Sequence, residues 1–93
     1  MLTSKENALS AIDTLVRYIE GIDGDLREGV LRTPERVIDS YEEIFSGYSG
    51  DAMNILDSTF NAEGYDGIVL LRDIEFHSTC EHHLQPFSGR AHI

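Results

Sequence analysis

Apolar residues recur at helical spacing through the first part of the chain. Between residues 5 and 20 they occupy positions that share one side of a helix, namely Leu9, Ile12, Leu15, Val16 and Ile19. This period predicts an amphipathic helix over 5–20, with Ser4 or Thr3 as the N-cap that accepts a free backbone N–H. The segment GIDGD that follows contains two glycines and acidic residues typical of turns, so the helix is expected to end there.

The segment RTPERV carries the signals of a second helix start. We expect Thr33 to cap the helix and Pro34 to occupy the first helical position, where its missing N–H is harmless. Glu35 would then face the positive end of the helix dipole. An apolar stripe follows, consisting of Val37, Ile38, Tyr41, Ile44 and Phe45. The segment SGYSG is expected to stop this helix at 46–50, and residues 51–66 show no clear period.

The pattern changes to that of a strand at GIVLLRDIEFHS, which is rich in β-branched and aromatic residues. It predicts a strand over 68–77, with side chains alternating between two faces. One face takes Ile68, Leu70, Arg72, Ile74 and Phe76, and the other takes Val69, Leu71, Asp73, Glu75 and His77. After this strand, QPFSG is typical of a turn and RAHI indicates the beginning of another strand.

These elements predict an α+β fold in which helices precede a small sheet. Its 93 residues allow one small domain at most. A hairpin of two strands is marginally stable by itself in water. Either another chain therefore completes the sheet, or the sequence is a fragment of a longer protein, and composition does not separate these alternatives.

Charge and cysteine content narrow the class of protein. The net charge of −10 argues against nucleic acid or an anionic membrane surface as a partner, because both would repel the chain. A small anionic ligand remains compatible, since all the basic residues but one are arginines, which grip phosphate well. One cysteine makes no internal disulfide, no apolar run approaches the ~20 residues of a membrane span, and the N-terminus lacks a signal-peptide core. A cytoplasmic protein is expected.

The segment STCEHHLQPF contains the single cysteine and two of the four histidines. If the backbone forms a helical turn there, residues three apart lie side by side, so Cys80 and His83 point to one place. A thiolate and an imidazole are both good zinc ligands. His82 points elsewhere and remains free to act as an acid or base near neutral pH.

Other interpretations of this segment stay open. A free cysteine is often a small buried apolar residue, and Cys80 activated by His82 or His83 would instead be a nucleophile. Zinc also needs a third protein ligand. The remaining histidines are His77, at a strand end, and His92, on the polar side of the last strand. The lack of an obvious third ligand again indicates an incomplete chain.

Several segments resemble the GTP cyclohydrolase I family. They are DLREG at 25–29, LRTPERV at 31–37, YEEIFSGY at 41–48 and VLLRDIEFHSTCEHHLQPFSGRAHI at 69–93. The last is far more specific than a bare Cys-x-x-His pair. The resemblance implies the T-fold (tunnelling fold), in which antiparallel sheets and helix pairs from many subunits form a homo-oligomeric ring with active sites between subunits. Residues 1–93 would be the N-terminal part of one domain, with a helical region at 1–50 and the start of the sheet at 66–93.

The resemblance also implies residue roles and a reaction. Cys80 and His83 are two of three zinc ligands, His82 is the catalytic acid/base for the purine imidazole ring, and Arg36 reaches the triphosphate. The family's third ligand is a cysteine further downstream than Ile93. The reaction is zinc-dependent hydrolysis of GTP to 7,8-dihydroneopterin triphosphate and formate, the first step of tetrahydrofolate and pterin biosynthesis. The alternative is a zinc-binding fragment that is inactive or depends on a partner.

Overall fold

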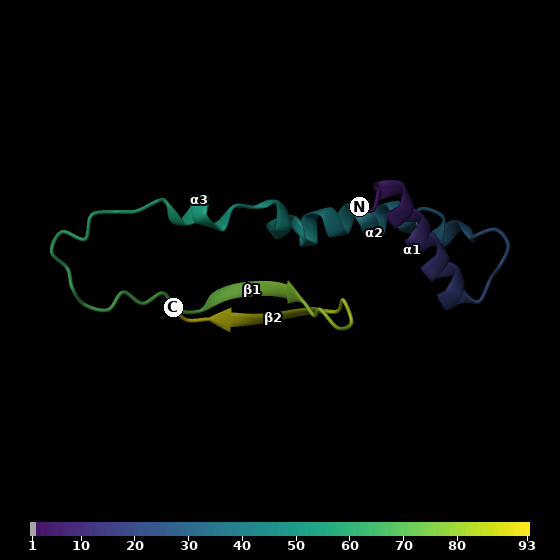
Figure 1. Cartoon of the computed structure of the whole chain (residues 1–93). Coiled ribbons are helices and arrows are strands. Elements are labelled where there is room, and N and C mark those ends of the chain that lie inside the picture. The colour runs from purple at the N-terminus through teal and green to yellow at the C-terminus, as the bar shows by residue number, and fades with distance from the viewer. Residues whose placement is uncertain (1) are drawn as a thin grey trace. The chain divides into compact units, whose positions relative to one another are not determined.

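The computed structural model describes residues 2–93, which form a helical unit ending at Ser58 and a strand unit beginning at Thr59. The helical unit contains α1 (Lys5–Glu20), η1 (Glu28–Val30), α2 (Thr33–Ile44), η2 (Ser46–Ser49) and α3 (Ala52–Leu56), and the strand unit contains β1 (Ile74–Thr79) and β2 (Pro86–Ala91) (Figure 1). The expected mixture of helices and a small sheet is confirmed. No helix within residues 2–93 is both long and apolar enough to cross a membrane.

Helix α1 has the bounds that the apolar period predicted. Its N-cap is Ser4, whose hydroxyl accepts a hydrogen bond from the Asn7 N–H at 3.1 Å. Its C-cap is Gly21, which adopts the left-handed conformation at φ +68° and donates its N–H to the Arg17 carbonyl at 2.8 Å. Glycine adopts this conformation at little steric cost, which explains the stop at GIDGD.

The predicted cap of the second helix is wrong by one residue. Thr33 already belongs to α2, the N-cap position is taken by Arg32, and no side chain caps the helix. The Arg36 N–H reaches the Arg32 carbonyl at 3.1 Å, which extends the helical bonding back by one residue. Pro34 lies in the first turn, as expected, and is the one residue classed as buried among residues 2–93.

The stretch 51–66, which lacked a pattern, contains the short helix α3. Asp51 caps it by accepting a hydrogen bond from the Met53 N–H at 3.1 Å. A helix this short has no room for an apolar period, so the capping residue was the one available signal.

Helices α1 and α2 contact each other and bury part of the predicted stripes. Leu9, Ile12 and Val16 of α1 are half-buried, as are Val37, Ile38 and Tyr41 of α2. Leu15 and Ile19 remain 50% and 73% exposed, although they belong to the same predicted stripe. No large apolar side chain is fully buried within residues 2–93, so the helix pair leaves apolar surface uncovered.

The strand unit is an antiparallel hairpin whose register runs from Ile74 opposite Ala91 to Thr79 opposite Pro86 (Figure 1). The predicted strand over 68–77 therefore begins six residues too early and ends two too early. QPFSG, predicted as a turn, contributes most of its residues to β2 instead. The turn that reverses the chain lies earlier, in the CEHHL segment.

A β-bulge at the start of β1 explains the late beginning of the strand. Leu71 and Ile93 exchange backbone hydrogen bonds of 2.6 and 2.9 Å, and the next pair is Ile74 with Ala91. Arg72 and Asp73 thus oppose the single residue His92, which defines a bulge. Asp73 adopts φ +58°, so the face alternation predicted across 68–77 breaks there.

The two faces of the hairpin differ in character. On one face the rings of Phe76 and Phe87 meet edge to face, with centroids 6.4 Å apart. Gly89 lies opposite Phe76, and a β-carbon at residue 89 would come within 2.8 Å of that ring. The other face carries charged and polar side chains, described with the site below.

Candidate metal site at the hairpin turn

The hairpin closes through a helical turn over Cys80–Gln85. The Leu84 N–H donates to the Cys80 carbonyl at 2.9 Å, and the Cys80 N–H donates to the Gln85 carbonyl at 2.8 Å. The first bond spans four residues, as in an α-helix, and Leu84 then reverses the chain at φ +55°. The helical turn expected at 80–83 is therefore present.

Cys80 and His83 stand three residues apart on this turn, a spacing that favours one shared side. Cys80 is a half-buried free thiol and His83 is exposed. A thiolate and an imidazole carried on one helical turn fit two positions of a zinc site by donor chemistry.

His82 occupies the rim of the turn. Its ring centroid lies 6.4 Å from that of His83, and the two ring planes are inclined at 74°, an edge-to-face arrangement. Its Nε2 atom lies 3.9 Å from a carboxylate oxygen of Glu81, and both side chains are largely exposed. His82 is thus accessible to a ligand in solution.

Neither histidine considered as a third ligand joins Cys80. His92 accepts a hydrogen bond through Nδ1 from the Asp73 N–H at 3.0 Å, at the end of the hairpin opposite the turn. His77 lies on β1 opposite Ser88, roughly 10 Å before Cys80 at a strand rise of ~3.3 Å per residue. Within residues 2–93 no three metal-binding side chains come together.

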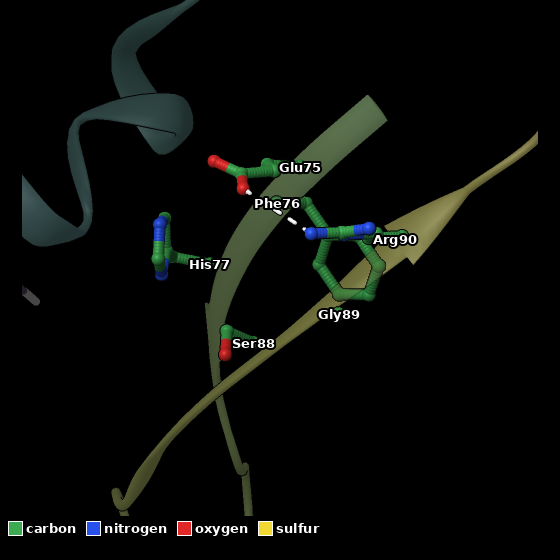
Figure 2. Close-up of a pocket in the computed structure, with 6 residues that line it drawn as sticks. All are labelled: Glu75, Phe76, His77, Ser88, Gly89 and Arg90. Atoms are coloured by element: carbon green, nitrogen blue, oxygen red, sulfur yellow. Dashed lines mark ion pairs between the residues drawn. The ribbon is translucent and has the colours of Figure 1, made fainter. Parts of the chain in front are cut away.

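His77 belongs instead to a shallow polar pocket on the face of the hairpin (Figure 2). Glu75, His77, Ser88 and Arg90 line it, and Figure 2 marks the ion pair in which Arg90 lies 4.0 Å from Glu75. Arg90 also lies 3.9 Å from Asp73. These side chains are mostly exposed, so the pairs add little stability. The sequence analysis missed this cluster because the bulge at Asp73 and the cross-strand register set which residues become neighbours.

Arg36 lies in the helical unit, in the first turn of α2. Its side chain is exposed and pairs with no carboxylate among residues 2–93. Arg17 and Arg27, by contrast, are held by Asp13 at 2.7 Å and by Glu20 at 2.6 Å. Arg36 is therefore a cation available to an anionic ligand.

A Cys–His pair on a hairpin turn with an accessible histidine beside it is typical of a metal-dependent enzyme. Comparison with known proteins identifies a family within this class of metal-dependent enzymes. A family model described as GTP cyclohydrolase I matches residues 9–93, and the chain belongs to that family.

Curated relatives named GTP cyclohydrolase 1 agree with this assignment. The Rickettsia bellii protein is 50% identical over 91 residues, which cover 97% of this chain and 46% of the relative. The Maricaulis maris protein is 46% identical over 91 residues, with 97% and 43% covered. The Hyphomonas neptunium protein is 45% identical over the same length and coverage. This chain therefore spans less than half the length of these relatives.

Proposed function

We propose that this chain is the N-terminal part of a GTP cyclohydrolase I, which hydrolyses GTP to 7,8-dihydroneopterin triphosphate and formate. This reaction opens tetrahydrofolate and pterin biosynthesis. The observation that carries the proposal is the family match over residues 9–93, which includes the Cys80–Gln85 turn with its zinc-type donors. Within the matched region, the turn supplies backbone geometry that suits the zinc-type donors Cys80 and His83.

Cys80 and His83 would hold zinc in this enzyme. When bound, zinc supplies a Lewis acid that makes water a strong nucleophile near neutral pH. A third ligand would come from other polypeptide, because no three metal-binding side chains come together among residues 2–93. The family's downstream cysteine has that role in the proposal.

His82 would move the proton. Hydrolysis of the purine imidazole ring needs a proton at a ring nitrogen while water adds to the adjacent carbon, and histidine is the side chain that enzymes use most often for such a transfer. The side chain of His82 is 77% exposed, which leaves it accessible to a substrate.

Arg36 would bind the triphosphate. Its guanidinium presents several donors to phosphate oxygens and pairs with no carboxylate in the described residues. On a chain of net charge −10, an arginine without a carboxylate partner among the described residues is a local positive charge that attracts an anion.

We further propose that residues 1–93 are the beginning of one T-fold domain, with helices at 1–50 and the first sheet strands at 66–93. The uncovered apolar residues support assembly of a homo-oligomeric ring with active sites between subunits, because Ile68, Val69 and Leu70 are 58–88% exposed and precede the sheet directly. The chain is assigned to the cytoplasm, with GTP and its own copies as partners and neither nucleic acid nor membrane.

A second candidate is a zinc-binding fragment that is inactive or depends on a partner. The observation in its favour is that no three metal-binding side chains come together among residues 2–93. The two candidates differ in whether this segment supports turnover when the missing part is present.

A chimera tests this difference. We would replace the matching region of the Rickettsia bellii relative by residues 1–93 and measure zinc per chain and formate release from GTP. Zinc binding with formate release is expected. A folded chimera that releases no formate would contradict the enzyme assignment, and the matched Cys80→Ser chimera controls for adventitious zinc because a hydroxyl is a poor zinc ligand.

A further inference from the structure

Leu84 occupies an unfavourable backbone conformation at the end of the metal-site turn. Its φ of +55° lies in the left-handed region, where the β-carbon of an L-residue crowds the following carbonyl oxygen. Glycine, and to a lesser degree asparagine or aspartate, normally fill such positions. A leucine here is therefore held in place by its surroundings.

Two backbone hydrogen bonds of Cys80 hold Leu84 in this conformation. The Leu84 N–H donates to the Cys80 carbonyl at 2.9 Å, and the carbonyl of the next residue, Gln85, accepts the Cys80 N–H at 2.8 Å. Both backbone polar groups of Cys80 are thus bonded to the segment that Leu84 redirects. The chain reversal at Leu84 is what brings Gln85 back beside Cys80.

The side chain of Leu84 contributes little to this arrangement within the described residues. It is 56% exposed. The conformation of the backbone, rather than the shape of the side chain, is the feature on which the turn depends.

We propose that Leu84 is a positioning residue for the zinc site, acting through its left-handed backbone conformation. By closing the turn it holds Cys80 and His83 on one helical turn before metal binds, without contacting the metal itself. This inference rests on the proposed function, since it assumes that Cys80 and His83 are zinc ligands.

A series of substitutions separates backbone from side chain. Leu84→Gly lowers the cost of the left-handed conformation, Leu84→Ala keeps it, Leu84→Val raises it through a β-branched side chain, and Leu84→Pro forbids it and removes the N–H. A backbone role predicts zinc affinity in the order Gly, then Leu and Ala together, then Val, then Pro. A side-chain packing role predicts Leu first, then Val, Ala and Gly.

The most closely matched pair replaces Leu84 by L-alanine or by D-alanine. Joining a peptide of residues 1–79, a peptide that begins at Cys80 and the remaining Rickettsia bellii polypeptide by successive ligations gives the chimera with either enantiomer. D-alanine prefers the left-handed conformation, so we expect its chain to bind zinc roughly tenfold more tightly than the L-alanine chain. The two chains have the same composition and the same side-chain volume.

Two readouts would be taken on this chimera, which supplies the polypeptide expected to hold the third ligand. Zinc affinity would be measured by competition with a chromophoric chelator, with Cys80→Ser as the control for binding through the thiol. Hydrogen exchange at the Cys80 and Leu84 amides, in the absence of metal, would report the turn itself. We expect protection of both amides to follow the same order as zinc affinity.

The outcomes distinguish the inference from the proposed function. Equal affinity of the D- and L-alanine chains, or the side-chain order, would overturn the positioning role while leaving the zinc ligands in place. Equal zinc affinity of the original and Cys80→Ser chains would show that the zinc assignment has failed, and the positioning role would fall with it. Tighter binding by the D-alanine chain, lost on Cys80→Ser, would establish both.

Discussion

Residues of the CEHH segment differ in exposure. Cys80 is half-buried, whereas His82 and His83 are exposed. Burial suits a thiol that serves as a ligand, because it limits oxidation and solvent competition. Exposure suits the proposed role of His82, because its imidazole has to reach a substrate.

Replacing His82 by alanine in the chimera should abolish ring opening and leave zinc bound. The imidazole would supply a proton that no neighbouring group replaces, and general acid–base catalysis contributes about 10²–10⁴-fold. Formate release and zinc per chain are the two measurements, and His77→Ala is the matched control because His77 lies on β1, away from the turn. Parallel loss of zinc and activity in His82→Ala would identify His82 as a ligand instead.

At the scale of elements, the hairpin is bounded by two backbone irregularities. Leu84 at φ +55° closes one end, and the bulge with Asp73 at φ +58° shapes the other. At the bulge the imidazole of His92 accepts a hydrogen bond from the Asp73 N–H. This backbone donor has no partner in the hydrogen bonds between the two strands, because a bulge leaves one residue unpaired. His92 is therefore accounted for by the structure of the hairpin.

His92→Ala should loosen the bulge end of the hairpin. Loss of one hydrogen bond, at ~0.5–1.5 kcal/mol, corresponds to roughly two- to twelvefold faster exchange of the Asp73 amide. Hydrogen exchange by NMR measures this directly. The control is His77→Ala, which removes a histidine from the same hairpin at a position opposite Ser88. Equal exchange rates in both variants would mean that His92 does not hold the bulge.

The helix pair is joined at one end by Lys5, whose ammonium lies 2.8 Å from Glu42. The hydrogen bond and charge of Glu42 raise the pKa of Lys5 above its ordinary value of 10.5. A raised pKa means that the pair stabilises the fold below pH ~10.5 and that this contribution disappears as the pH rises through the folded-state pKa.

Lys5→Gln should therefore slightly lower the melting midpoint of the helical signal at neutral pH. In strong base, the variant and the original chain should have the same midpoint. The pair is exposed, so added salt should shrink the difference as well. Circular dichroism at 222 nm across pH 7–12 follows it, with Glu6→Gln as a control on the same helical turn. If the two midpoints still differed above pH ~12, the stabilisation by Lys5 would not be ionic.

At the scale of the whole molecule, the described residues hold secondary structure without a closed core. No large apolar side chain is fully buried, and Phe60, Ile68 and Val69 are 94%, 88% and 81% exposed. Folding needs apolar burial to offset the loss of chain entropy. The family match explains this lack of buried apolar surface, because the chain covers less than half the length of its relatives.

The 93-residue chain alone should bind a hydrophobic dye and melt without a sharp heat-capacity peak. The Rickettsia bellii chimera should bind little dye and melt cooperatively, since the added polypeptide covers the exposed apolar residues. Dye fluorescence and calorimetry of the two proteins make the comparison. If the isolated chain unfolded cooperatively and bound no dye, its apolar residues would not need further polypeptide to cover them.

Local patterns accounted for much of the fold. The period of α1, its Ser4 cap and its Gly21 stop follow from interactions within a few residues, and so does the helical turn that carries Cys80 and His83. The CEHH motif and its flanks likewise carried the family, which the match over residues 9–93 confirms. Such features are encoded where they occur, so the sequence by itself determined them.

Only the tertiary structure decided which residues become neighbours across the hairpin. The bulge at Asp73, the pairing of Glu75 with Arg90 and the His92 hydrogen bond join residues 15 to 19 positions apart. Their register depends on where the turn closes, and one extra residue in a strand shifts every later side chain to the other face. The predicted strand over 68–77 failed for this reason: its composition favours extended backbone, whereas pairing with β2 sets where the ladder begins.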